Sequence, residues 1–534
     1  MRYKAILFDS RSIQSYIFAG NRLKTNIGAS YLVERVFDDV LLPVVRDVLG
    51  ADALDAKTWT DVEEPRWDAM SAAARVGYIG GGNALLIFRA ETADETLRTI
   101  VSTFTKQLLV RIPGLRTGAA IGQLDLGADG SFAGEQNLTA LVHALKNGQN
   151  TVFPLVSLPC PGLTLDCRES GETANAWDAE ERRFYAWEVE MKLRADRRDG
   201  REAPAEAELM AKLASVLSAG EQEVLQRDYA FPMEFSDLGQ RETENDIAVV
   251  HIDGNNMGRK FQNCNTLTER KNMSRAIRRK TIAAFGALVQ KIIGSFAVCR
   301  SELSIAYDRE GRSFLPVRPL VLGGDDMTFV CAAKVAVPYA RFIMERLMED
   351  GIASCGGITI MKTSYPFFRA YEMAEDLCGA AKDRMRMLEA QEGQGTESCW
   401  LDYAILHGEQ APTLAQFRAQ EYSGARGGLH FGPYRVDAEA ANADSLAALI
   451  EGVRGMRRLP RSKVKELRRV LAYGEHEQRQ FMAQFAHLGK SDAAMRLPDV
   501  PAWHAYEEAL WVDGRTPYVD AIELMEYLIA DGEV

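Results

Sequence analysis

The sequence has little of several features that mark common protein classes. Its eight cysteines are scattered and none forms a Cys-x-x-Cys pair, which disfavours a paired-cysteine zinc or redox site. No apolar run approaches the ~18 residues of a membrane-spanning helix. No Gly-x-x-x-x-Gly-Lys-Ser/Thr phosphate loop and no kinase signature occurs, and the seven histidines have no spacing typical of a metal cluster. We therefore expect no membrane span, no P-loop and no kinase site.

The chain also has fewer basic than acidic residues. The net charge of −12 at pH 7 argues against a surface that coats nucleic acid generally, so any RNA contact would come from a local patch or from partners. The chain runs from Met1-Arg2-Tyr3-Lys4-Ala5 directly into a predicted strand, with no signal peptide ahead of it. Together with the unpaired cysteines, this start predicts a cytoplasmic protein with reduced thiols.

Two adjacent carboxylates on a double glycine are the most informative feature that is present. Gly323-Gly324-Asp325-Asp326 lies between the apolar runs 319–322 and 327–331, which predict two short strands with the glycines and aspartates at the tip of their hairpin. Glycine leaves the backbone open there, so a divalent cation carrying a nucleotide phosphate has room to approach. The alternative is an ordinary glycine–aspartate turn with two solvated carboxylates.

A second acidic motif lies upstream. Asp253 ends the apolar run 246–252 and is followed by the turn Gly254-Asn255-Asn256. The pattern next predicts a helix at 266–293, followed by the hairpin. After the hairpin it predicts a helix at 335–348, a strand at 357–361 and a helix at 370–388. This is the order of a ferredoxin-like palm, in which the first strand lies beside the hairpin. Asp253 and the hairpin carboxylates are therefore expected to converge, as a pair of Mg²⁺ or Mn²⁺ ions requires.

The amino-terminal region repeats this layout. A strand at 3–9, a helix from Ser12, a strand–glycine–strand segment at 78–88, a helix at 93–110 and a strand at 114–121 predict another palm. Its hairpin carries Gly82-Asn83 where the later one carries aspartates, so no metal pair is expected there. The sequence thus predicts an α+β chain with two ferredoxin-like palms, a helical insertion and a C-terminal helical domain. The expected boundaries are 1–125, 126–240, 241–405 and 406–534, with charged helix at 177–217 and connecting chain at 218–245.

These residues resemble a known family. The Gly-Gly-Asp-Asp hairpin, the Asp-Gly-x-x-Met-Gly turn 253–258 and Ala380-Ala381-Lys382 look like the polymerase/cyclase palm of the large subunit of type III CRISPR effectors, the Cas-ten family. They are more distantly similar to diguanylate and adenylyl cyclases. The Ser-Ile-Gln helix and the Gly-Gly-Gly-Asn hairpin 80–83 resemble the first palm of the same subunits.

The resemblance implies an enzyme, a metal-dependent nucleotidyltransferase that converts ATP to a cyclic oligoadenylate second messenger for antiviral defence. It also implies two Mg²⁺ or Mn²⁺ ions. Family members act among CRISPR effector subunits with guide RNA and target RNA, and the sequence leaves open whether this chain does so or works alone. The implied catalytic residues are Asp253, Asp325 and Asp326, which hold the metals with the Gly254 carbonyl. The implied nucleotide-binding residues are Gly254, Asn256, Gly323, Gly324, Lys382, Gly81, Gly82 and Asn83. Lys382 would grip the triphosphate; without the resemblance it is a solvated helix lysine.

The chain also departs from the family pattern. Asn255 stands where the family often has a second aspartate, so one metal contact loses its charge. No His-Asp dipeptide occurs, so the nuclease domain that begins many members is not recognisable. Cys160 and Cys167 are too sparse for the family's zinc module, and structural zinc is expected to be absent.

Several alternatives remain open from the sequence. A GTP-using synthase of cyclic dinucleotides differs only in base recognition, and some relatives join AMP to S-adenosylmethionine. A non-catalytic scaffold of a CRISPR ribonucleoprotein would retain the palms for shape alone. In the C-terminal domain, the basic run 454–469 is either a solvated helix face or an RNA contact.

Overall fold

The computed structural model describes residues 1–56, 59, 66–68, 70–132, 137–151, 162, 164–197, 203–239, 244–392, 397–408, 412–438, 441–489 and 495–529. By internal packing the chain divides into two compact units. The first comprises Met1–Val216, Asn256–Ile282 and Leu320–Asp325, and the second Leu217–Asn255, Ala283–Pro319 and Asp326–Val534. The division passes through the acidic hairpin, between Asp325 and Asp326. The fold is α+β.

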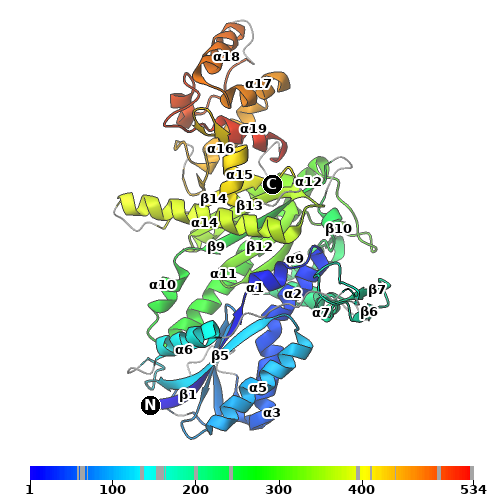
Figure 1. Cartoon of the computed structure of the whole chain (residues 1–534), viewed down its shortest axis with the longest axis vertical. Helices are drawn as coiled ribbons and strands as arrows, with labels where there is room; N and C mark the ends of the chain where they lie inside the picture. Colours follow the sequence, from blue (N-terminus) through cyan, green and yellow to red (C-terminus); the bar gives the residue numbers. More distant parts are fainter. Residues whose placement is uncertain are drawn as a thin grey trace. The chain divides into compact units, whose positions relative to one another are not determined.

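The first unit is built on a five-stranded sheet (Figure 1). Its order is β2 (Leu54–Asp55), β3 (Ala74–Gly80), β4 (Asn83–Phe88), β1 (Arg2–Arg11) and β5 (Arg116–Asp125). The short β2 runs parallel to β3, and all other neighbours are antiparallel. Strand β1 is therefore central, because it pairs with the hairpin strand β4 on one side and with β5 on the other.

Alternate residues of β1 face opposite layers, as the two-residue period of a strand requires. Ala5 and Leu7 belong to a buried cluster that includes Leu141 of α6 (Leu138–Thr151). Phe8 points the other way and meets Phe104 of α5 (Asp94–Arg111), with ring centroids 5.1 Å apart. Apolar packing on both faces explains why β1 and β4 read as nearly continuous hydrophobic runs. The remaining elements of this unit are α1 (Ile13–Phe18), α2 (Leu23–Val36), η1 (Phe37–Leu41), α3 (Leu42–Leu49), η2 (Ala51–Ala53), β6 (Ala176–Asp178), β7 (Arg183–Tyr185), α7 (Trp187–Asp196), α8 (Pro204–Ala214) and α10 (Met257–Gln262).

The second sheet has six strands. Its order is β11 (Val317–Gly323), β12 (Asp326–Ala332), β9 (Asp246–Gly254), β13 (Ser354–Lys362), β14 (Trp400–Ile405) and β17 (Tyr434–Arg435). Strand β9 is antiparallel to both β12 and β13, whereas β14 runs parallel to β13. In chain order β9, β11, β12 and β13 take the same relative places as β1, β3, β4 and β5 in the first sheet. Four strands of each sheet therefore follow the same spatial order.

Helix α14 (Phe367–Glu392) lies across this sheet and packs on β9, β13 and β14 (Figure 1). Its approach depends on Gly357 of β13. A Cβ atom at that position would lie 2.0 Å from the Ala374 carbonyl oxygen, a distance that no real side chain tolerates. The glycine therefore lets the helix sit directly on the strand, which brings the α14 side chains over the end of β9.

The remaining described elements are mainly helices, together with a few short strands. They are α9 (Ala219–Asp228), β8 (Tyr229–Ala230), η3 (Phe235–Asp237), α11 (Leu267–Gly294), α12 (Phe296–Glu302), β10 (Ser313–Phe314), η4 (Ala333–Val335), α13 (Ala336–Glu349), α15 (Leu414–Glu421), β15 (Ser423–Gly424), β16 (Gly427–Gly428), α16 (Leu446–Met456), α17 (Arg461–Leu471), α18 (Glu475–Leu488), η5 (Pro501–Tyr506), α19 (Tyr518–Glu523) and η6 (Leu524–Glu526). Among the described residues no single helix is long and apolar enough to cross a membrane. The bent pair α11 and α12 meets that test of length and composition only when the two are taken together.

Two predictions of local structure are confirmed only in part, although the charged segment 177–217 does contain α7 and α8. The charged segment 177–217 does not begin as helix, because Trp177 and Phe184 face each other across the β6–β7 hairpin, with ring centroids 4.8 Å apart. The segment 218–245 is not simply connecting chain, because it contains α9. The Ser218 hydroxyl oxygen accepts a hydrogen bond from the Glu221 backbone N–H, and the Glu221 carboxylate accepts one from the Ser218 backbone N–H, a capping box that is visible in the sequence.

Candidate functional site

Asp253 and Asp326 lie directly opposite each other in the second sheet. The antiparallel register of β9 and β12 pairs them residue to residue. Facing residues of neighbouring strands carry their side chains on the same side of the sheet, with Cβ atoms about 5 Å apart. The two carboxylates are partly exposed, at 30% and 23%. The strand beside the hairpin thus brings its aspartate to the hairpin aspartate, as the predicted topology requires.

The turn that carries the hairpin pair is a two-residue loop, Gly324-Asp325, between β11 and β12. Gly324 has φ +64°, a left-handed conformation that glycine adopts without steric cost. Its carbonyl accepts a hydrogen bond of 2.7 Å from the Thr281 hydroxyl of α11. The glycine therefore permits this turn, and the bond from the helix holds its tip in place.

The corresponding hairpin of the first sheet has a different turn. Gly81 and Gly82 both have positive φ, at +57° and +77°, and Asn83 begins β4. The Asn83 amide donates a hydrogen bond of 3.0 Å to the Gly81 carbonyl. This tip presents backbone and an amide, with no carboxylate of its own.

Lys382 of α14 is paired with Asp253. Its ammonium group donates a hydrogen bond to Asp253 Oδ2, and the lysine side chain is 20% exposed. Burial lowers the pKa of Lys382, but the Asp253 carboxylate more than offsets this effect, so the pKa is raised and the lysine stays charged. Lys382 is therefore not the solvated helix lysine that its sequence neighbours allow. Asp253 already holds one cation, its own protein's ammonium group.

Asn255, the residue in place of a second aspartate, is held by hydrogen bonds to other residues. Its side chain is buried, and its amide donates to the Ser398 carbonyl at 3.0 Å and to Met385 Sδ at 3.1 Å. A carboxylate in this position would have no hydrogen to donate and would face a carbonyl oxygen. Asparagine suits this position because its amide hydrogens have buried acceptors.

We expect Asn255→Asp to destabilise the protein by about 3 kcal/mol or more, because it buries a charge and removes two donated hydrogen bonds. Urea unfolding measures the change, and Asn147→Asp on the exposed side of α6 is the matched control. The variant should not bind Mn²⁺ more tightly than the wild type. A stable variant with higher Mn²⁺ affinity would instead place residue 255 among the metal ligands.

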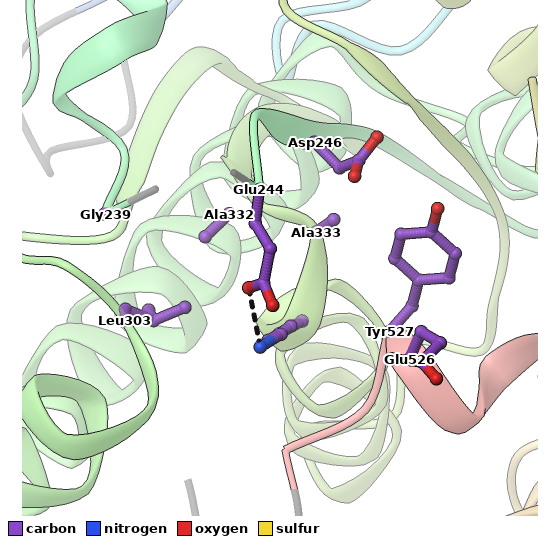
Figure 2. Close-up of a pocket in the computed structure, with 9 residues that line it drawn as sticks. Gly239, Glu244, Asp246, Leu303, Ala332, Ala333, Glu526 and Tyr527 are labelled. Atoms are coloured by element: carbon purple, nitrogen blue, oxygen red, sulfur yellow. Dashed lines mark ion pairs between the residues drawn. The ribbon is translucent and has the colours of Figure 1, made fainter. Parts of the chain in front are cut away.

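The described residues also form a pocket of about 170 Å³ at the opposite end of the second sheet. Figure 2 shows Glu244, Asp246 and Tyr527 around it, with Lys334 paired to Glu244 at 2.8 Å. It adjoins the start of β9 and the end of β12, whereas Asp253 and Asp326 lie at the other ends of these strands. The pocket is also smaller than the ~300 Å³ typical of ligand sites. It is not part of the candidate site.

Two other observations bear on the sequence predictions. Asn256 has φ +58° and precedes α10, so the predicted nucleotide-binding turn is tight at this residue. The spacing of the histidines gave no sign of a metal cluster, yet ligand atoms of Asp499, His504 and Glu507 lie within 4.8 Å of one another on the surface. Of the cysteine pair discussed for zinc, Cys167 is buried and Cys160 lies outside the described residues.

Sequence reasoning missed His251, which lies beside the candidate site. Its Nδ1 atom is 3.1 Å from Thr328 Oγ1 and 3.4 Å from Asp326 Oδ1. Burial lowers the pKa of His251, and the Asp253 carboxylate opposes this effect only in part. The one available signal was a polar residue inside the apolar run of β9, two positions before Asp253.

Solved structures share this fold. A chain in a crystal structure of the Csm1-Csm4 cassette in complex with cA3 superposes with a TM-score of 0.50 at 13% identity, over 99% of this chain and 70% of that one. A chain in the same cassette in complex with AMPPNP gives a TM-score of 0.50 at 13% identity, over 100% of this chain and 70% of that one. No protein-family model and no curated protein sequence matches the chain.

Proposed function

We propose that this chain is a metal-dependent nucleotidyltransferase that converts ATP to cyclic oligoadenylate. The observation that carries the proposal is the facing pair Asp253 and Asp326, with the Lys382 ammonium group beside it. Two partly exposed carboxylates and a lysine at one end of a sheet are suited to hold divalent cations and a triphosphate. The shared fold supports the assignment, because the superposed structures are described as complexes with cA3 and with AMPPNP, an ATP analogue.

The residues present fit a pair of Mg²⁺ or Mn²⁺ ions. Both ions prefer oxygen ligands, and the partly exposed carboxylates of Asp253 and Asp326 provide them on neighbouring strands. Asp325 and the Gly254 carbonyl complete the proposed ligand set. When bound, the ions lower the pKa of the attacking 3′-hydroxyl and neutralise charge on the pyrophosphate that leaves.

The protein's own groups bind and orient the substrate. Lys382 releases Asp253 and binds the triphosphate instead, so that its positive charge lies beside the phosphates. The backbone of Gly323, Gly324 and Asn256 surrounds the phosphates. Gly324 has no side chain that would block their approach. Gly81, Gly82 and Asn83 bind the second, acceptor nucleotide.

The domain organisation follows from the same proposal. Residues 1–125 and 241–405 are ferredoxin-like palms, of which only the later one carries hairpin carboxylates. Residues 126–240 form the insertion and 406–534 the C-terminal helical domain. We place the protein in the cytoplasm, within or beside a CRISPR effector complex that contains guide RNA and target RNA.

The test is product identification. The purified chain is incubated with Mn²⁺ and each radiolabelled nucleoside triphosphate in turn, and ATP should give pyrophosphate and cyclic oligoadenylate. Asp325→Ala with Asp326→Ala should abolish the product without unfolding the protein. Cyclic dinucleotides from GTP, or an AMP adduct when S-adenosylmethionine is added, would redirect the substrate assignment. Inactivity with every nucleotide, with and without guide and target RNA, would favour a non-catalytic scaffold. A fully active double variant would refute the proposed site.

A further inference from the structure

His251 connects the interior of the second sheet to the candidate metal ligands. In the β9–β12 register His251 faces Thr328, just as Asp253 faces Asp326 two residues further along. Nδ1 lies 3.1 Å from the Thr328 hydroxyl oxygen and 3.4 Å from Asp326 Oδ1. The first distance is within the normal range of a hydrogen bond, and the second is longer than the usual one. The imidazole thus stands between a buried hydroxyl and a carboxylate.

The surroundings of the ring select one tautomer. An uncharged imidazole carries a single hydrogen, either on Nδ1 or on Nε2. A lone pair on Nδ1 would face the lone pairs of a carboxylate oxygen, which is repulsive, whereas an N–H in that place is attracted to both oxygens. The hydrogen therefore resides on Nδ1.

The ring is also held in orientation. Thr328 is fully buried, and the Tyr371 ring of α14 meets the imidazole edge-on, with centroids 5.6 Å apart and planes at 77°. The imidazole side chain itself is only 8% exposed. Rotation of the ring would lose the Thr328 contact and the packing against Tyr371, so Nδ1 stays on the side of Asp326.

We propose that His251 is a positioning residue that orients the Asp326 carboxylate for a divalent cation. The inference rests on the proposed function, because it assumes that Asp326 is a metal ligand. An N–H placed 3.4 Å from one carboxylate oxygen attracts that oxygen and so favours one direction for the other. Loss of such outer partners lowers metal affinity about 10- to 100-fold. Thr328 acts one step further out by holding the imidazole.

Two amide substitutions test the role of Nδ1. His251→Asn places an N–H near the position of Nδ1, whereas His251→Gln places it near the position of Nε2. Mn²⁺ affinity, measured by the electron paramagnetic resonance of free Mn²⁺ without nucleotide, should weaken about tenfold in the Gln variant. The Asn variant should remain within about threefold of the wild type. Thr328→Val should weaken binding as well, and urea unfolding checks that each variant is folded.

Equal Mn²⁺ affinity in the wild type and the Gln variant would overturn the inference. So would equal losses in the Asn and Gln variants, because the ring would then act only through packing. Asp326→Ala separates this inference from the proposed function. If that variant loses Mn²⁺ binding while His251→Gln keeps it, only the inference fails; if Asp326→Ala binds Mn²⁺ like the wild type, the metal site itself fails.

Discussion

Replacing Asp253 by Asn should reduce the formation of oligoadenylate from ATP by about 10³-fold or more, because stabilisation by a metal is worth several kcal/mol of the barrier. The amide keeps the size of the side chain but removes the charge that would hold a cation opposite Asp326. It also leaves Lys382 without its carboxylate partner, which is the main group that raises the pKa of this lysine against the effect of burial. Product formation from labelled ATP with Mn²⁺ measures the effect.

The same strand supplies a matched control. Asp246 begins β9 at the end far from Asp253, where it accepts a bond of 2.8 Å from the partly exposed Lys362. Asp246→Asn makes the same chemical change in the same element and should keep activity close to that of the wild type. Activity of Asp253→Asn within tenfold of the wild type would refute the proposed site. Equal losses in the two variants would indicate damage to β9 rather than to a metal ligand.

The sequence predicted the second sheet well because its elements carry strong local patterns. Helix α11 was expected at 266–293 and is found at Leu267–Gly294, and α13 and α14 are found within a few residues of their predicted ends. The hairpin was marked by glycines between apolar runs. Once that order of elements is recognised, the place of Asp253 beside the hairpin follows from the topology of the fold.

Side-chain environments that depend on distant residues were not predictable in the same way. His251 reads as one polar residue in an apolar strand, and its contact with Thr328 exists only in the register of two strands that are far apart in sequence. Asn255 resembled an impaired ligand until its burial and its Ser398 partner were known. The β6–β7 hairpin was missed because charged residues around Trp177 imitate the composition of a helix.

A cluster of buried charges joins the second sheet to the C-terminal helices. His430 Nε2 is 2.8 Å from Asp402 of β14, and its Nδ1 is 3.1 Å from Asp520 of α19. Arg418 of α15 bonds the other oxygen of Asp402. Asp520 also accepts bonds from the Tyr434 hydroxyl at 2.5 Å and the Phe431 backbone at 2.8 Å. With His430 protonated, the two carboxylates are balanced by two cations, which is how buried charges are tolerated.

Asp520→Asn should therefore destabilise the protein by about 3–5 kcal/mol, the usual cost of removing one partner of a buried charge pair. The Asn side chain removes the negative charge that faces His430. Its amide hydrogens also face N–H and O–H donors that need an acceptor. Urea unfolding measures the loss. Asp513→Asn, at an exposed turn of the same region, is the control and should change stability by no more than about 0.5 kcal/mol.

The same cluster predicts a pH dependence with a definite sign. Burial alone would lower the pKa of His430, but Asp520 and Asp402 raise it from 6.5 to about 10. The folded state thus binds a proton that the unfolded chain releases above pH 6.5, so this stabilisation is fully present below pH 6.5 and is lost as the pH rises towards 10. Asp520→Asn should flatten this part of the stability profile. An unchanged profile would mean that His430 does not carry the charge that balances the two carboxylates.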